Sequence, residues 1–175
     1  MSRSLGNTIA DSLDQGRRYA ELLIAGIPAD KFARFAAPSG APVVSNHPAF
    51  AFGHLALYPP KIAKGVGADP ASVGVPATFE SIFSKDVACQ DDPDGSIYPS
   101  MDQIVTVFRT SHEVASQLLR EAADEVFSVE NPVGGNFTER FPTVGSAITF
   151  YAGGHLLMHL GQISAWRRMA GLGAA

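Results

Sequence analysis

Apolar residues recur at helical spacing in four long segments of this chain, and no run of alternating β-branched residues suggests a strand. The first segment should end before Pro28, because proline cannot continue a helix. A short helical turn around residues 30–36 follows. The apolar face of the first segment consists of Leu5, Ile9, Leu13, Gly16, Ala20 and Leu23.

The second helical segment covers residues 46–64. Asn46 or His47 can cap its start, and Pro48 suits the first helical position, where the missing N–H costs nothing. Two consecutive prolines near the far end do not fit a straight helix. We therefore expect a kink or a break at that point.

A long connection rich in Gly, Pro, Asp and Ser covers residues 65–99 and contains a short amphipathic piece at 78–84. A connection of this length inside a compact domain is usually functional or partly structured. We expect it to cross from one end of a helical bundle to the other.

The third and fourth helical segments cover residues 100–127 and 143–170. The third opens with a Ser-x-x-Gln sequence that fits a capping box. The fourth ends before Gly171, which suits a C-terminal cap, and Arg167 and Arg168 favour the negative end of the helix dipole. Four long helices with a crossover loop between the second and third predict an all-α protein, a four-helix bundle.

Composition points to a globular protein. The chain has 175 residues, of which 46% are hydrophobic and 17% charged. The length and the lack of internal repeats or low-complexity linkers predict a single domain over residues 1–175. The net charge of −4 at pH 7 and the absence of a basic run argue against a nucleic-acid partner.

The sequence also indicates the cellular compartment of the protein. The first residues, MSRSLGNTIADSLDQG, contain no apolar core of the kind found in signal peptides. No stretch approaches the roughly 20 apolar residues that a transmembrane helix needs. Cys89 is the only cysteine, which excludes an intrachain disulfide and fits a reducing compartment. We expect a cytoplasmic protein without a membrane partner.

Two histidines one helical turn apart, His155 and His159, lie in the most apolar helical segment, TFYAGGHLLMHLGQISAWRRMAG. Residues at i and i+4 share a helix face, so their imidazoles can bind one metal ion, although backbone carbonyls could also satisfy them. A third histidine, His54, lies in FAFGHLALY. Together they predict a metal site with room for water or substrate. A metalloprotease is excluded because Leu156 stands where H-E-x-x-H requires glutamate.

Several further residues are candidates for the surroundings of this site. Gln162 could orient a ligand or a bound water, or be a surface glutamine. Tyr151 could donate a hydrogen bond near the metal, or simply pack. His112 could be a fourth ligand or proton shuttle, although a hydrogen-bonded boundary histidine is the simpler interpretation. Cys89 could be a nucleophile, but no cationic cluster or helix start nearby would lower its pKa. Gly53 inside a helix suggests close packing.

Three sequence motifs resemble those of the DinB-like (YfiT-like) superfamily of metal-dependent helix bundles. They are NHPAFAFGHLAL in the second helix, YPSMDQIVTVF at the start of the third and HLLMHLGQISAWRRMAG in the last, so the resemblance covers most of the chain. In that family one histidine comes from the second helix and an HxxxH pair from the fourth. These positions correspond here to His54, His155 and His159.

The resemblance implies a four-helix bundle with a divalent metal, zinc or nickel, in an open three-histidine site, and a homodimer. Family members with known activities are mostly thiol S-transferases or thiol-dependent isomerases that use bacillithiol, mycothiol or glutathione. Our first hypothesis is therefore a metal-dependent enzyme that activates a low-molecular-weight thiol or water towards a small-molecule substrate. The alternatives are a metal- or ligand-binding module without turnover, serving a stress response, and a structural dimeric bundle without metal.

Overall fold

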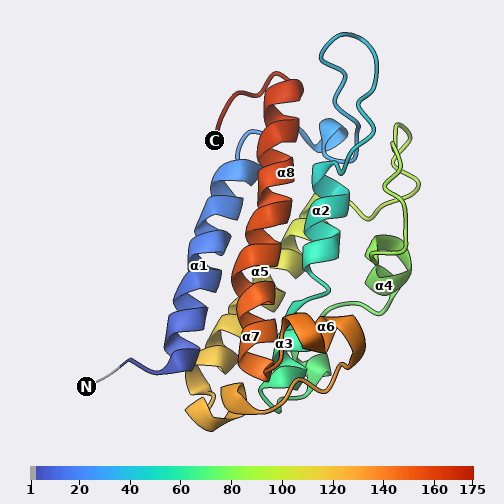
Figure 1. Cartoon of the computed structure of the whole chain (residues 1–175). Coiled ribbons are helices and arrows are strands. Elements are labelled where there is room, and N and C mark those ends of the chain that lie inside the picture. The colour runs from blue at the N-terminus through green and yellow to red at the C-terminus, as the bar shows by residue number, and fades with distance from the viewer. Residues whose placement is uncertain (1–2) are drawn as a thin grey trace.

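The structure, a computed structural model, describes residues 3–175 (Figure 1). Met1 and Ser2, the first residues of the expected domain, lie outside the described part. The prediction of an all-α protein is confirmed, because residues 3–175 contain helices and no strand. Within the same residues, no helix combines the length and the apolar character that crossing a bilayer requires.

The helices differ widely in length. The long ones are α1 (Leu5–Ile24), α5 (Met101–Glu121) and α8 (Leu156–Met169). The shorter ones are α2 (Pro48–Leu55), α3 (Pro59–Gly65), α4 (Thr78–Phe83), α6 (Gly135–Arg140) and α7 (Val144–Thr149). A π-helical segment, Phe150–His155, joins α7 to α8, and 3₁₀ turns form at Ala29–Lys31, Pro70–Val73 and Asp124–Ser128.

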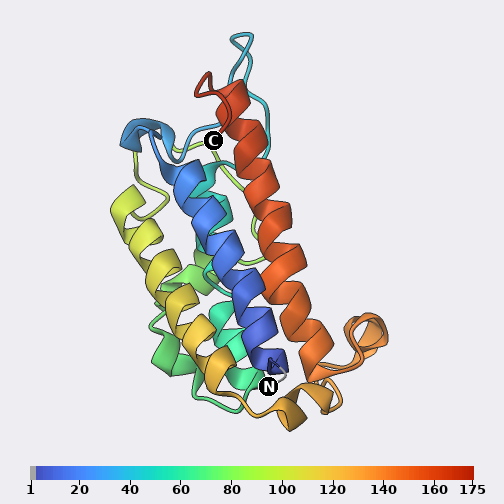
Figure 2. The ribbon, with the colours of Figure 1, turned by 90° about the vertical axis from the view of Figure 1, so that its left-hand side faces the viewer.

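The long helices run side by side and enclose one hydrophobic core. Figure 2 shows α1 flanked by α5 on one side and α8 on the other, and α1 packs against both. Helix α2 packs against α5 and α8, and α3 continues along α5 below it (Figure 1). The largest side chains in this core include Leu13, Phe52, Phe108, Ile148 and Trp166. The arrangement brings α2 and α8 face to face, which positions the site described below.

Helix α2 begins and ends as its sequence predicts. His47 is the N-cap and its Nδ1 accepts a hydrogen bond from the Phe50 N–H at 3.2 Å, while Pro48 occupies the first helical position. All eight residues of the helix are buried. The expected break occurs between Leu55 and Pro59, where α3 starts in a new direction (Figure 1).

The connection between α3 and α5 is partly structured. Its amphipathic piece forms α4, which packs against α2 and carries the fully buried Phe83. Gly53 of α2 lies directly under the Phe83 ring, so the close packing suggested by this helical glycine is present. The rest of the connection passes along the outside of α2 before α5 begins (Figure 1).

Helix α5 is shorter than the pattern predicts. Its capping box forms between Ser100 and Gln103, as expected, but the helix ends at Glu121 rather than near Phe127. The chain then becomes extended and forms a 3₁₀ turn, in which Asp124 Oδ1 accepts a hydrogen bond from the Leu5 N–H at 2.8 Å. A continued helix would carry both the carboxylate and the buried Phe127 ring away from the start of α1.

The fourth segment is helical throughout its expected range but not uniform. Helix α7 has a capping box between Thr143 and Ser146, and the π-helical segment separates it from α8. Gly171 has a φ of 77°, the left-handed conformation that ends a helix, as predicted. Helix α6 was not anticipated, because the Pro/Gly-rich sequence before it suggests only a loop.

Candidate metal centre

His54, His155 and His159 come together between α2 and α8. One ring nitrogen of each lies within 4.8 Å of the others. The ring centroids of His155 and His159 are 4.6 Å apart, and that of His54 is 5.3 and 4.8 Å from them. The structure thus juxtaposes the three histidines that the sequence nominates, from segments about a hundred residues apart.

The hydrogen bonds of His54 and His159 define which nitrogen of each ring carries the proton. His54 Nδ1 lies 2.8 Å from the carbonyl oxygen of Phe83, which can only accept, so Nδ1 carries the proton. His159 Nδ1 lies 3.0 Å from Oε1 of Gln162 and donates to it in the same way. In both rings Nε2 is left with its lone pair directed at the cluster. Histidines that ligate metals are typically held by such bonds from the other nitrogen.

Gln162 is itself held in position. Its Oε1 also accepts a hydrogen bond from Nδ2 of Asn46 at 3.0 Å. The chain of contacts from Asn46 through Gln162 to His159 fixes the imidazole from the loop that precedes α2. Gln162 is an exposed residue, as one interpretation of the sequence has it, and it also contacts a candidate ligand.

The spacing of the two Nε2 atoms of His155 and His159 fits a shared ion. They are 3.2 Å apart. Two nitrogens bound about 2.0–2.1 Å from one zinc ion are roughly 3.3 Å apart at a tetrahedral angle and roughly 2.9 Å apart at a right angle. The donor set, three imidazole nitrogens, suits zinc, nickel, copper and iron alike. The residues present therefore fit a divalent metal ion.

Burial keeps these imidazoles neutral. It is the main cause that lowers the pKa of His155 to about 3 and that of His159 to about 4, with a further contribution from the neighbouring histidines. Burial also lowers the pKa of His54. A neutral imidazole has the free lone pair that a metal ligand needs.

A cavity of about 400 Å³ opens beside the three histidines. The connection between α3 and α5 forms its other wall through Lys85, Val87, Ala88 and Cys89. Burial raises the pKa of the Cys89 thiol to about 11, so this thiol is not an activated nucleophile. The complete lining is Asn46, Phe50, His54, Tyr58, Lys85, Val87, Ala88, Cys89, His155 and His159.

Tyr58 belongs to this site and was missed in the sequence. Its hydroxyl lies 3.3 Å from Nε2 of His54, and its ring centroid is 3.9 Å from that of His155. Burial raises its pKa to about 12, so it remains a phenol. Its four-residue spacing from His54 is only a weak signal, because Tyr58 lies beyond the end of α2 and its contact with His54 depends on the turn between α2 and α3.

The two other nominated residues lie farther away. Tyr151 is one ring removed from the histidines, between Tyr58 at 5.2 Å and Phe137 at 5.7 Å. His112 is not part of the cavity lining. It is buried in α5, where its Nδ1 donates to the carbonyl oxygen of Phe108 at 2.8 Å, which agrees with the simpler interpretation.

The π-helical segment Phe150–His155 ends on a nominated ligand. Such segments are rare and occur frequently at functional sites, because the extra residue in the turn reorients the side chains that follow. Two glycines, Gly153 and Gly154, lie within it, and Gly153 faces Ser12 of α1 so closely that a Cβ would be 3.1 Å from its Oγ. The segment therefore determines the orientation of the His155 imidazole relative to that of His159.

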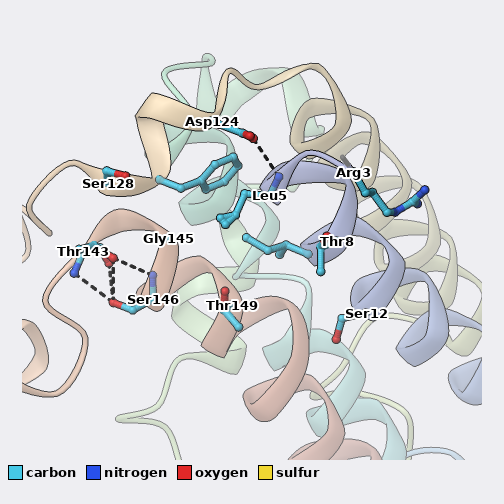
Figure 3. A pocket seen from close by; sticks show the side chains of 12 residues that line it. Arg3, Leu5, Thr8, Ser12, Asp124, Ser128, Thr143, Gly145, Ser146 and Thr149 are labelled. Atoms are coloured by element: carbon cyan, nitrogen blue, oxygen red, sulfur yellow. Dashed lines mark hydrogen bonds between the residues drawn. The ribbon is translucent and has the colours of Figure 1, made fainter. Parts of the chain in front are cut away.

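A larger cavity, of about 660 Å³, lies beside the N-terminal end of α1 (Figure 3). Hydroxyl groups are its main polar feature, and those of Thr143 and Ser146 are engaged in the capping box of α7. Its carboxylate, Asp124, accepts the Leu5 N–H, and its cation, Arg3, pairs with Asp11. Because its lining contains no histidine or cysteine, the chemistry favours the smaller cavity beside the histidines.

No family model, curated protein or solved structure matches this chain. A function must therefore be argued from the site itself.

Proposed function

We propose that this protein is a cytoplasmic metal-dependent enzyme acting on small molecules, similar in activity to a thiol S-transferase. The observation that carries the proposal is the convergence of His54, His155 and His159, with the Nε2 lone pairs of His54 and His159 directed at the cluster. The cavity beside them is within the size range of small-molecule sites.

The proposal includes the DinB-like four-helix bundle. The four helices of this bundle would be α1, the broken helix α2–α3, α5, and the continuous run from α7 to α8. The residues between α3 and α5 would be the crossover connection. The packing of α1 and of α2 against both α5 and α8 supports this arrangement.

A divalent ion bound by three neutral ligands keeps its full charge and lowers the pKa of a thiol or water bound to it. The chain's own residues have separate roles. Phe83 and Gln162 orient His54 and His159 through their Nδ1 protons. Lys85 lies at the cavity wall, where its Nζ pairs with Oδ1 of Asp86 at 2.9 Å, and it would have to leave this exposed ion pair to contact an anionic group of the substrate.

A binding module without turnover is the second candidate. The specific observation in its favour is that the cavity lining offers no general base apart from the nominated ligands, since Tyr58 and Cys89 have raised pKa values and Lys85 is a cation. Such a module would retain the metal and bind a thiol without transferring it.

Elemental analysis of untagged protein tests the proposal first. We expect near-stoichiometric zinc or nickel after reconstitution, and none in the His155→Ala/His159→Ala variant. The control is Leu157→Ala/Met158→Ala, which alters two exposed residues of the same helical turn and should retain the metal. A parent protein that binds neither metal would refute the metal-dependent function.

Transfer assays with bacillithiol, mycothiol and glutathione against thiol-reactive electrophiles then separate the two candidates. Metal-dependent conjugation that is lost in the histidine variant supports the enzyme. Saturable thiol binding without conjugation supports the binding module.

A further inference from the structure

Tyr58 lies at the joint between α2 and α3, and three neighbours fix its orientation. Its hydroxyl is 3.3 Å from Nε2 of His54 and its ring packs on that of His155. The Nζ atom of Lys61 lies over its ring, 4.6 Å from the centroid. The break at Pro59 places Tyr58 here, because Tyr58 is the residue that precedes α3.

The direction of the hydrogen bond between Tyr58 and His54 follows from the proton inventory. The Nδ1 proton of His54 is engaged by the carbonyl of Phe83, so Nε2 has only a lone pair to offer. The Tyr58 hydroxyl must therefore donate to it. This lone pair is also the one that a metal ion would need, because Nε2 is the nitrogen of His54 that faces His155 and His159.

Competition for one lone pair has two consequences. In the metal-free protein the Tyr58 hydroxyl occupies a ligand nitrogen of the site. When an ion binds, the hydroxyl loses this acceptor but stays at the cavity wall, since the contacts of its ring with His155 and Tyr151 remain. Its proton is then available to an acceptor inside the cavity.

We propose that Tyr58 is a ligand-binding residue of this cavity. Its hydroxyl releases Nε2 of His54 when the metal ion binds and then donates its O–H to the anionic sulfur or oxygen atom of the small molecule bound in the cavity. This inference rests on the proposed metal-dependent function. It specifies the ligand class as a small thiol or another ligand whose donor atom carries negative charge.

Tyr151 provides a matched control. It is a half-buried tyrosine of the same aromatic cluster, in contact with Tyr58, but the rings on its other side belong to Phe137 and Phe150. Replacing either tyrosine with phenylalanine removes one oxygen and keeps the ring. A role in packing alone would give both variants the same properties.

Metal affinity is the first measurement, made with Co²⁺ against a chromophoric chelator. Tyr58→Phe should bind Co²⁺ about fivefold more tightly than the parent, since the ion no longer displaces an ordinary hydrogen bond. Tyr151→Phe should match the parent. Unchanged or weaker Co²⁺ binding by Tyr58→Phe would overturn the inference.

Thiol affinity is the second measurement, made on the Co²⁺-loaded proteins with 2-mercaptoethanol as the probe and thiolate-to-cobalt charge-transfer absorption as the signal. Tyr58→Phe should bind the thiol about tenfold more weakly, because a hydrogen bond to a charged acceptor is lost. Tyr151→Phe should again match the parent. Equal thiol affinities of the parent and Tyr58→Phe would contradict the inference.

The two tests separate this inference from the proposed function. A parent protein that binds no Co²⁺ refutes the metal site, and the role of Tyr58 fails with it. A parent that binds Co²⁺ and thiol, beside a Tyr58→Phe variant that behaves identically, leaves the metal site intact and refutes the role of Tyr58 alone.

Discussion

Phe83 of α4 packs against Gly53, the one residue of α2 that has no side chain. A Cβ at Gly53 would lie 2.5 Å from Cδ1 of Phe83, closer than two carbon atoms can approach. The carbonyl of the same phenylalanine accepts the Nδ1 proton of His54, the residue after the glycine. The missing side chain thus allows α4 to approach α2 closely enough to orient a candidate metal ligand.

Substitution of this glycine should therefore affect both stability and metal binding. Alanine has a higher helix propensity, worth about 1 kcal/mol, but in Gly53→Ala the methyl group must displace a fully buried ring. Overpacking of this kind costs roughly 1–3 kcal/mol. We expect a net loss in the free energy of unfolding, measured by urea denaturation, together with weaker binding of zinc as Phe83 moves away from His54.

Gly161→Ala is the control for this experiment. Gly161 lies inside α8, and nothing stands within 4 Å of the position that its Cβ would take. The same change should there be neutral or stabilising by up to about 1 kcal/mol. If both variants were equally stable, the contact between Gly53 and Phe83 would impose no constraint.

Gln162 offers a second test, because it touches the site only through another residue. Its Oε1 accepts the Nδ1 proton of His159, and Gln162→Ala removes that acceptor. Loss of such an outer partner typically lowers metal affinity by about 10–100-fold. Competition with a chromophoric chelator measures the effect. Gln117→Ala, on the exposed side of α5, should leave the affinity unchanged, and equal affinities for both variants would show that Gln162 does not hold His159.

The fold was predictable where local chemistry decides it. The buried stripe of α1, the capping box at Ser100 and the proline break at Pro59 each depend on residues close in sequence, and each is found where the pattern places it. The exception is Leu5, which the pattern assigns to the buried face and which is 46% exposed in the first turn of α1. The end of α5 was not predictable in this way. It is determined by Asp124 and Phe127, whose partners lie at the start of α1, more than a hundred residues away.

The candidate site, like the fold, was predictable only where residues close in sequence decide the structure. The spacing of His155 and His159 indicates a shared face, and the structure brings the third nominated histidine, His54, close to them. The position of Tyr58 could not be derived, because it depends on how the chain turns after α2 ends. The π-helical segment Phe150–His155 could not be predicted either, since local sequence gives no signal for one extra residue in a turn.

The pH dependence of stability should reveal His112. Burial is the main cause that lowers its pKa to about 4 in the folded protein, and Arg17 adds to the effect. In the unfolded chain the pKa returns to about 6.5. Below pH 6.5 the unfolded state therefore binds a proton that the folded state does not, and the free energy of unfolding falls as the pH drops towards 4, by up to about 1.4 kcal/mol per pH unit.

The variant His112→Gln removes this titration. Urea denaturation of the metal-free proteins at pH 7, 6 and 5 should show the parent losing stability faster than the variant over this range. Comparison of slopes isolates His112, since the other buried histidines contribute equally to both proteins. Parallel pH profiles would mean that His112 is protonated as readily in the folded state as in the unfolded chain.

Arg167 stabilises a different helix from the one that carries it. The sequence suggests that it interacts with the dipole of its own helix, whereas its Nη1 donates to the carbonyl oxygens of Leu23 and Ala25, at 2.7 Å each. These carbonyls lie at the end of α1, where the last turn of a helix leaves acceptors without partners. Arg167 as a residue is only 6% exposed, and its bond to Leu23 is buried while that to Ala25 is partly buried.

Arg167→Met should consequently destabilise the protein by about 2–4 kcal/mol, because it keeps the apolar stem and leaves the carbonyls of Leu23 and Ala25 without their charged donor. Arg168→Met is the matched control. Arg168 is exposed, and its side-chain bonds to residues 3–175 go to Ser164, four residues earlier in the same helix, so its loss should change stability by less than about 0.5 kcal/mol. Thermal denaturation of both variants measures the difference. Equal melting temperatures would mean that the end of α1 finds other donors, and that α8 is held against α1 by apolar packing alone.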